Sequence, residues 1–235
     1  MAHFNWFTFL DSRIDHHNLH IAGALLVLAI ITTIALVFRA KLKSASERLL
    51  PSGKVTLPNI LEVTVEWILG LMESIIGPSA RLYFPLICGL FIYIFISNLL
   101  GIIPGLLPPT ENINTNLACS LVVFIYYNVM GIKQQGLKHY LAHFMGPIIW
   151  LAPLMIVVEL IGHAVRPLSL SLRLFGNITG DHVVLGIFSD LVPLVVPIIF
   201  MALGIFVSFI QAFVFSLLST IYIGLAVAQQ EEAHH

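Results

Sequence analysis

Charged side chains are scarce in this sequence. Asp, Glu, Lys and Arg make up 10% of the 235 residues, whereas 58% are hydrophobic. An ordinary soluble domain is about 25% charged, so this deficit excludes that class and indicates an integral membrane protein. The formal net charge is −1, and the few basic residues form no cluster of the kind that binds nucleic acid. We therefore expect no nucleic-acid partner.

Cysteine is also scarce. Cys88 and Cys119 lie inside apolar runs, where a thiol behaves as a small hydrophobic group. Two cysteines make neither a disulfide framework nor a zinc site. The histidines near the start of the chain could bind a metal, but they lack a metal-ligand spacing with cysteine, which favours solvated side chains: His3, His16, His17 and His20. We expect neither a metal nor a cofactor.

A secretory leader is missing as well, because the first twenty residues contain acids and histidines and no basic stretch with a cleavage site. The first apolar run is therefore predicted to be retained as a transmembrane helix. Crossing a bilayer takes about 20 apolar residues as a helix, and the runs here do not alternate as barrel strands do. We predict an all-α membrane protein with about five membrane-embedded helices and one interfacial helix. Its single domain (1–235) comprises an outer N-terminal segment (1–19), a first span (20–38), the interfacial helix (57–77), a helical hairpin (82–131), two long, steeply tilted helices (145–228) and a cytoplasmic tail (229–235).

The basic residues predict the orientation, because connections rich in Lys and Arg stay in the cytoplasm. Two connections carry them, whereas residues 101–116 have none: Arg39, Lys41, Lys43, Arg48, Lys54 and Arg81 in the first, Lys133 and Lys138 in the second. We expect the N-terminus outside and the C-terminus inside. The acids of the interfacial helix, Glu62, Glu66 and Glu73, recur among apolar residues on one amphipathic face. They either contact a partner or are simply solvated.

The last two apolar segments are too long for straight perpendicular spans. Each has roughly 40 residues, which makes a helix about 60 Å long against a hydrocarbon core of about 30 Å. Each must tilt, break or fold back. Pro167 predicts a kink, because it cannot donate to the carbonyl of His163. Pro193 and Pro197 indicate a turn followed by the start of the last helix.

Polar side chains interrupt the first of these segments: Glu159, His163, Arg166, Arg173, Asn177, Asp181 and His182. A charge at bilayer depth costs about 2.5 to 3.5 kcal/mol and usually marks a cavity, a partner or an ion path. At about 100° per residue, Glu159 and Asn177 lie within about 40° of Arg173. His163 and Asp181 lie about 80° from it, and His182 about 180° from it. His182 is therefore expected to address a different surface.

Simpler explanations remain open for three of these residues, which could lie near the membrane surface and extend to water: Glu159, Arg166 and Asp181. Gly176 and Gly180 permit close approach of a neighbouring helix, either for static packing or for sliding. On the last segment, Gln211 could pair with Arg173, line a file of water or make an ordinary interhelical hydrogen bond.

Several motifs resemble subunit a of the rotary F-type ATP synthases. They are PLSLSLRLFGN, which contains Arg173, SNLLGIIPG at Ser97–Gly105, PTENINTNLA after it and FIQAF at Phe209–Phe213. The resemblance covers roughly residues 57–228. It implies a stator that lies in the bacterial inner membrane beside a rotating ring of c subunits, each with a mid-membrane carboxylate. The implied partners are the c-ring, the peripheral-stalk b subunits and membrane lipid, and the implied role is proton translocation, with no enzyme activity in the isolated chain.

Residue by residue, the resemblance makes Arg173 the arginine essential for coupling, with Asn177 and Gln211 beside it. Glu159 matches an acid of the cytoplasmic half-channel, and the pair Asp181 and His182 matches positions of protonatable groups in the outer half-channel. Some members carry a histidine seven residues before the glutamine that corresponds to Gln211, and this chain has Gly204 there. The outer proton relay is therefore assigned to Asp181 and His182. His163 lies outside the pattern, and it remains, with Ser169, only a possible member of the proton path.

The implied mechanism rests on a fixed positive charge. Arg173 would keep a passing ring carboxylate ionised by lowering its pKa, and would block a direct proton wire between the half-channels. In lipid the carboxylate must be neutral, because burying its charge is too costly. A secondary transporter and a haem-binding redox subunit are the alternatives. The first predicts an internal repeat, which is not visible, and the second needs histidines facing each other from separate spans.

Overall fold

The computed structural model describes residues 19–45, 57–103, 106–136, 140, 149–191 and 195–228. Over these ranges the chain is helical and has no strand, and five stretches are long and apolar enough to cross a membrane. The all-α membrane fold is therefore confirmed. The predicted outer segment, apart from Leu19, and the cytoplasmic tail lie outside the described residues, as do His3, His16 and His17.

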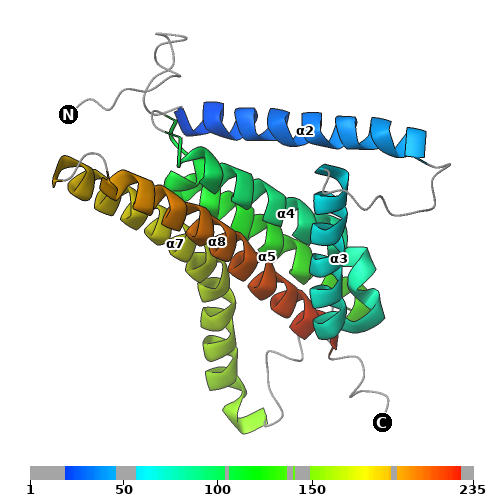
Figure 1. Ribbon diagram of the computed structural model, residues 1–235. Helices are drawn as coiled ribbons and strands as arrows, with labels where there is room; N and C mark the ends of the chain where they lie inside the picture. The colour runs from blue at the N-terminus through cyan, green and yellow to red at the C-terminus, as the bar shows by residue number, and fades with distance from the viewer. Residues whose placement is uncertain are drawn as a thin grey trace.

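Six helices and three short 3₁₀ turns make up the described chain (Figure 1). The helices are α2 (Leu19–Ala45), α3 (Leu57–Ile76), α4 (Ala80–Leu100), α5 (Ile113–Gln135), α7 (Ala152–Leu191) and α8 (Val195–Ala228); the turns are η2 (Gly77–Ser79), η3 (Pro109–Glu111) and η4 (Ile149–Leu151). Cys88 and Cys119 are both free thiols, on α4 and α5.

The predicted interfacial helix exists as α3, although its position at the membrane surface stays a prediction. Glu62 and Glu66 are exposed on it, and Glu73 lies 3.3 Å from the guanidinium of Arg81 on α4. The chain reverses between α3 and α4 at Gly77, whose φ of +74° is a conformation that glycine adopts at little cost. Apart from this turn the apolar sequence runs on from α3 into α4.

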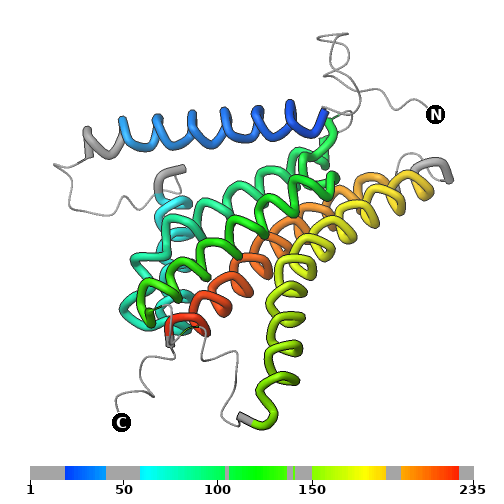
Figure 2. The backbone as a smooth tube through the Cα atoms, turned by 180° about the vertical axis from the view of Figure 1, so that it is seen from behind, coloured from blue at the N-terminus to red at the C-terminus, as the bar shows by residue number. Residues whose placement is uncertain are grey.

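The hydrophobic core lies between α3, α4, α5, α7 and α8. Trp67 of α3 stacks on Phe209 of α8 at 5.9 Å between ring centroids, and Phe91 of α4 meets both rings edge-on. Phe91 is 3% exposed and belongs to the core, whereas Trp67 and Phe209 are 42% and 39% exposed and lie at its edge. By contrast α2 crosses one side of the bundle, contacts α4 and η3, and exposes many of its apolar side chains (Figures 1 and 2). Its exposed face is expected to contact lipid.

The two long segments are single helices of 40 and 34 residues, α7 and α8. The prediction allowed each segment to tilt, break or fold back as a hairpin, and neither segment folds back. α7 contains Pro167 and bends, so that its first part diverges from α8 while its last part runs beside α8 (Figures 1 and 2). The bend fits the missing hydrogen bond at proline. Pro197 lies in the first turn of α8, as predicted, and Pro193 lies outside the described residues.

The connections gather at two opposite ends of the bundle. At one end Gly23 of α2 lies against Leu107, close to η3, and the last part of α7 also contacts η3. At the other end Gln134 of α5 donates to the hydroxyl of Tyr83 (2.7 Å), and Gln135 donates to the carbonyl of Ala226 on α8 (2.8 Å). These contacts fix α4, α5 and α8 to one another at this end of the bundle.

Candidate functional site

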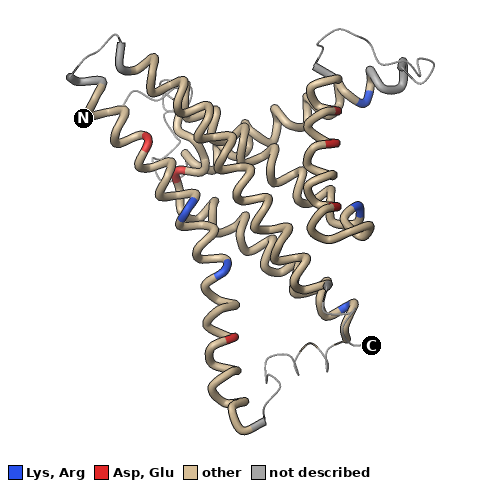
Figure 3. Tube along the Cα trace, turned by 60° about the horizontal axis from the view of Figure 1, so that its bottom comes forward, with Lys and Arg blue, Asp and Glu red and all other residues tan. Residues whose placement is uncertain are grey.

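Arg173 lies on an open face of α7. Leu170, Leu174 and Ile178 point into the core at a spacing of four residues, whereas Arg173 and Asn177 are exposed. Among the described residues no ion pair or hydrogen bond joins Arg173 to another side chain. The α7 sequence contains two arginines, Arg166 and Arg173, and Figure 3 shows Lys or Arg positions in the middle part of this helix. Its charge is available to a group outside the chain.

The glycines of the same face do not pack against another helix of this chain. A Cβ added to Gly176 or Gly180 would have nothing within 4 Å. Static packing of two helices within the described chain therefore does not explain them. The open face consists of Arg173, Gly176, Asn177 and Gly180, and it leaves room for a closely approaching neighbour.

Gln211 occupies a different environment from Arg173. Its side chain is 8% exposed on α8, inside the bundle. Within the described part of the chain no hydrogen bond connects it to Arg173, so a direct pair is not observed. Ser169, one turn before Arg173, is half-buried.

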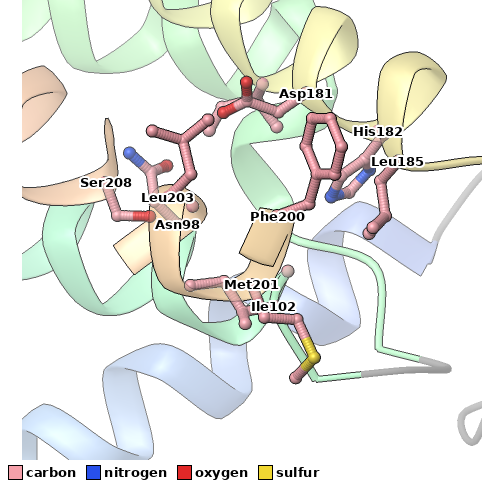
Figure 4. A pocket seen from close by; sticks show the side chains of 12 residues that line it. Asn98, Ile102, Asp181, His182, Leu185, Phe200, Met201, Leu203 and Ser208 are labelled. Atoms are coloured by element: carbon pink, nitrogen blue, oxygen red, sulfur yellow. The ribbon is translucent and has the colours of Figure 1, made fainter. Parts of the chain in front are cut away.

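Asp181 and His182 line a pocket at one end of the bundle, and the rest of its lining is largely apolar (Figure 4). Its other walls come from α4, the turn after it, and α8, and include Asn98, Gly204 and Ser208. The cavity measures about 40 Å³, whereas one water molecule needs about 10 to 15 Å³. Water can therefore fill it in contact with several polar groups.

The position of His182 agrees with the helical wheel, since it faces the pocket while Arg173 is exposed. Gly204, the position that the resemblance pairs with a histidine of some family members, lines the same pocket as His182. A histidine at either position would therefore reach the same pocket.

An acid that the sequence did not single out lies beside His182. Glu111 of η3 places Oε2 3.4 Å from Nδ1 of His182, within ion-pair distance, and the side chains of Glu111 and His182 are 32% and 27% exposed. The η3 turn is fixed by buried hydrogen bonds from Thr110 to Asn98 Oδ1 (2.7 Å) and from Asn116 to the Thr110 carbonyl (2.7 Å). The only sequence signal for Glu111 was an acid in a connection otherwise free of charge.

Gly101 makes this arrangement possible. A Cβ on it would lie 2.8 Å from Cγ of Pro108 and 3.1 Å from Nε2 of His182. Both distances are below ordinary van der Waals contact of about 3.5 to 4.0 Å. The absence of a side chain lets the imidazole lie against the end of α4.

A second polar cluster lies on the first part of α7. Oε1 of Glu159 is 3.6 Å from Nδ1 of His163 and 3.8 Å from Nη2 of Arg166. The Arg166 guanidinium also lies over the ring of Tyr222 on α8, 5.6 Å from its centroid. Arg166 is therefore paired with Glu159 and Tyr222, and its position near the membrane surface stays a prediction.

The two polar sites lie far apart along α7, with Arg173 between them. Glu159 precedes Arg173 by 14 residues and His182 follows it by 9, so the sites are about 35 Å apart at 1.5 Å per residue before allowing for the bend. That span is similar to a hydrocarbon core of about 30 Å. Neither site can pass a proton directly to the other. Among the described residues no three His, Cys, Asp or Glu side chains gather as a metal site.

Known proteins resemble this chain over nearly its whole length. A family model described as ATP synthase A chain matches residues 22–224. The ATP synthase subunit a of Bdellovibrio bacteriovorus is 44% identical over 225 residues, 96% of this chain and 98% of the relative. The ATP synthase subunit a 1 of Syntrophotalea carbinolica is 45% identical over 236 residues, which cover 100% of this chain and 95% of the relative. The ATP synthase subunit a of Geobacter sulfurreducens is 47% identical over 214 residues, which cover 91% of this chain and 88% of the relative. The chain therefore belongs to the family of ATP synthase subunit a.

Proposed function

We propose that this chain is the proton-translocating stator of an F-type ATP synthase, in which two half-channels end on opposite sides of the membrane and Arg173 faces the carboxylates of the c-ring. As a member of its family the chain is an integral protein of the bacterial inner membrane and one subunit of the synthase complex. The finer assignments below rest on the arrangement of α7.

The observation that carries the proposal is the exposed Arg173 on a face with open space at Gly176 and Gly180. A guanidinium stays protonated under all physiological conditions, so it is a permanent charge. A ring helix with a mid-membrane carboxylate fits this face in charge and in depth. Beside Arg173 the carboxylate loses its proton, and away from it, in lipid, the carboxylate must take one up.

The half-channels correspond to the two polar sites. Protons from outside reach the ring through the pocket of Asp181 and His182, and protons released from the ring leave past Glu159. Asn177 and Gln211 adjust the polar surroundings of Arg173. Because about 35 Å of helix separates the two sites, the ring must turn to carry a proton from one to the other. The membrane potential drives this step with about 2.3 kcal/mol per charge per 100 mV.

The proposed orientation has the N-terminus outside and the C-terminus in the cytoplasm. The basic residues support it, because Arg81 and Lys133 belong to the end of the bundle that is held together by Gln134 and Gln135. The pocket of His182 is then external. The peripheral-stalk b subunits are proposed as further partners, and the isolated chain is proposed to have no enzyme activity.

The test is Arg173→Ala in the complete synthase in membrane vesicles, with Arg81→Ala as the matched control. Arg173 is exposed and has no ion pair among the described residues, so its loss is expected to change stability by no more than about 0.5 kcal/mol. The complex should assemble, while ATP synthesis driven by a proton gradient should vanish. Normal synthesis by the assembled Arg173→Ala complex would refute the proposal.

A further inference from the structure

Residues from three parts of the chain contact His163. It lies on α7 with its side chain 12% exposed. The rings of Phe124 and Tyr127 on α5 meet its imidazole edge-on, with centroids 6.1 Å and 5.8 Å away. The hydroxyl of Tyr140 lies 3.2 Å from Nε2, and Glu159 Oε1 lies 3.6 Å from Nδ1. The imidazole therefore has a fixed orientation.

The hydrogen bonds around Tyr140 determine which nitrogen of His163 carries the proton. The amide nitrogen of Asn128 donates to the Phe124 carbonyl (2.7 Å), so the amide oxygen of Asn128 faces Tyr140. The hydroxyl of Tyr140 donates its single hydrogen to that oxygen. Toward His163 the hydroxyl can then only accept, which assigns a hydrogen to Nε2. In the neutral imidazole Nδ1 is left as an acceptor.

With the hydrogen on Nε2, the contact between Nδ1 and the Glu159 carboxylate is favourable only if a proton lies between them. A bare Nδ1 and an ionised carboxylate would face each other as two acceptors. A proton between them removes the conflict, either on the carboxyl oxygen or on Nδ1 of an imidazolium. Both nitrogens of the imidazolium are donors, and Tyr140 and Glu159 satisfy them. Among the described residues, the titratable and charged groups around His163 are Glu159 and Arg166 on α7, Tyr127 on α5, Tyr222 on α8, and Tyr140, which lies between α5 and η4 in the sequence.

We propose that His163 is a proton-carrying residue of the cytoplasmic half-channel, which takes the proton of Glu159 at Nδ1 and releases it to water, while Tyr140 and Asn128 fix the imidazole for that step. The O–H bond at Glu159 breaks as the N–H bond at Nδ1 forms, and the N–H bond breaks again when water accepts the proton. Glu159 is 30% exposed, so water can reach the pair. The inference rests on the proposed function of the chain.

The proposal predicts a particular pH dependence. Histidine changes its charge close to neutral pH, so a relay through it should respond to the pH of the cytoplasmic side. Replacing it with Gln keeps a polar side chain of similar length but removes the exchangeable site. We expect ATP synthesis by His163→Gln to fall about tenfold, less than the 10²- to 10⁴-fold of a positioned acid or base, because water offers a slower route.

The experiment uses complete synthase in vesicles and varies the pH on the cytoplasmic side at constant proton driving force. His163→Gln should lose rate and show a flattened pH profile, while His20→Gln on α2 should match the unmodified complex. Tyr140→Phe retains the imidazole but removes the acceptor for Nε2–H, so its pH profile should shift with a smaller loss of rate. An unchanged profile in assembled His163→Gln would overturn the inference, and so would an unchanged profile in Tyr140→Phe if His163→Gln failed to assemble. Activity of Arg173→Ala in the same vesicles would instead refute the function on which the inference rests.

Discussion

Gly101→Ala tests the outer pocket with the smallest possible addition of atoms. Gly101 caps α4 with φ −68° and ψ −16°, values that alanine adopts freely, so the backbone gives no reason for strain. The new Cβ would lie 2.8 Å from the buried ring of Pro108 and 3.1 Å from Nε2 of His182. The first distance is about 1 Å short of ordinary contact. Either the turn before η3 or the imidazole must move by a comparable amount.

Overpacking of this size costs about 1 to 3 kcal/mol. If the imidazole moves, its 3.4 Å contact with Glu111 is lost, and the correctly arranged pocket becomes about 5- to 150-fold less populated relative to the displaced one. We expect ATP-driven acidification of vesicles to slow severalfold or more, with a lower thermal stability of the purified complex.

The matched control is Gly89→Ala on the same helix. Gly89 is exposed and a Cβ there would meet nothing within 4 Å. Alanine is the better helix former by about 1 kcal/mol, so this variant should be as stable as the unmodified complex or more stable. Identical pumping and melting of the two alanine variants would refute the argument, because it would mean that the contact at Gly101 carries no energetic consequence.

Two further substitutions test the surroundings of the pocket. Glu111→Gln removes the carboxylate facing His182, so ATP-driven acidification should slow severalfold, while Glu66→Gln on α3 should leave it unchanged; equal rates would exclude Glu111 from the proton path. Thr110→Val keeps the side-chain shape but leaves the buried Asn98 Oδ1 without its donor, which should cost about 1 to 3 kcal/mol in thermal or proteolytic stability. Thr32→Val, at an exposed hydroxyl bonded only within its own helix, should show no such loss, and comparable melting of both variants would contradict the reasoning.

The sequence predicted the helices and the two sides of α7 well, because both follow from local periodicity. Continuous apolar runs of this length form helices in a membrane, because the strands of a membrane barrel alternate apolar and polar residues. The wheel angle between Arg173 and His182 needed only the helical repeat, and the exposure of one and the pocket position of the other agree with it.

Contacts that cross between elements could not be predicted in this way. Glu111 reaches His182 across 71 positions, and it does so because Thr110, Asn98 and Asn116 fix an irregular turn that has no sequence period. Likewise nothing local relates Tyr140 to His163. The sequence suggested Gln211 as a direct partner of Arg173, but α8 turns that side chain inward while α7 turns the guanidinium outward.

The outward position of Arg173 also bears on the order in which the complex is built. Before any partner arrives, this guanidinium would lie at bilayer depth beside lipid, where insertion scales assign it about 2.5 to 3.5 kcal/mol. A neighbour with a carboxylate removes that penalty, whereas a purely apolar helix does not. The same charge that would direct protons during turnover therefore favours the correct companion during biogenesis, and leaves the orphan subunit at higher energy than the assembled one.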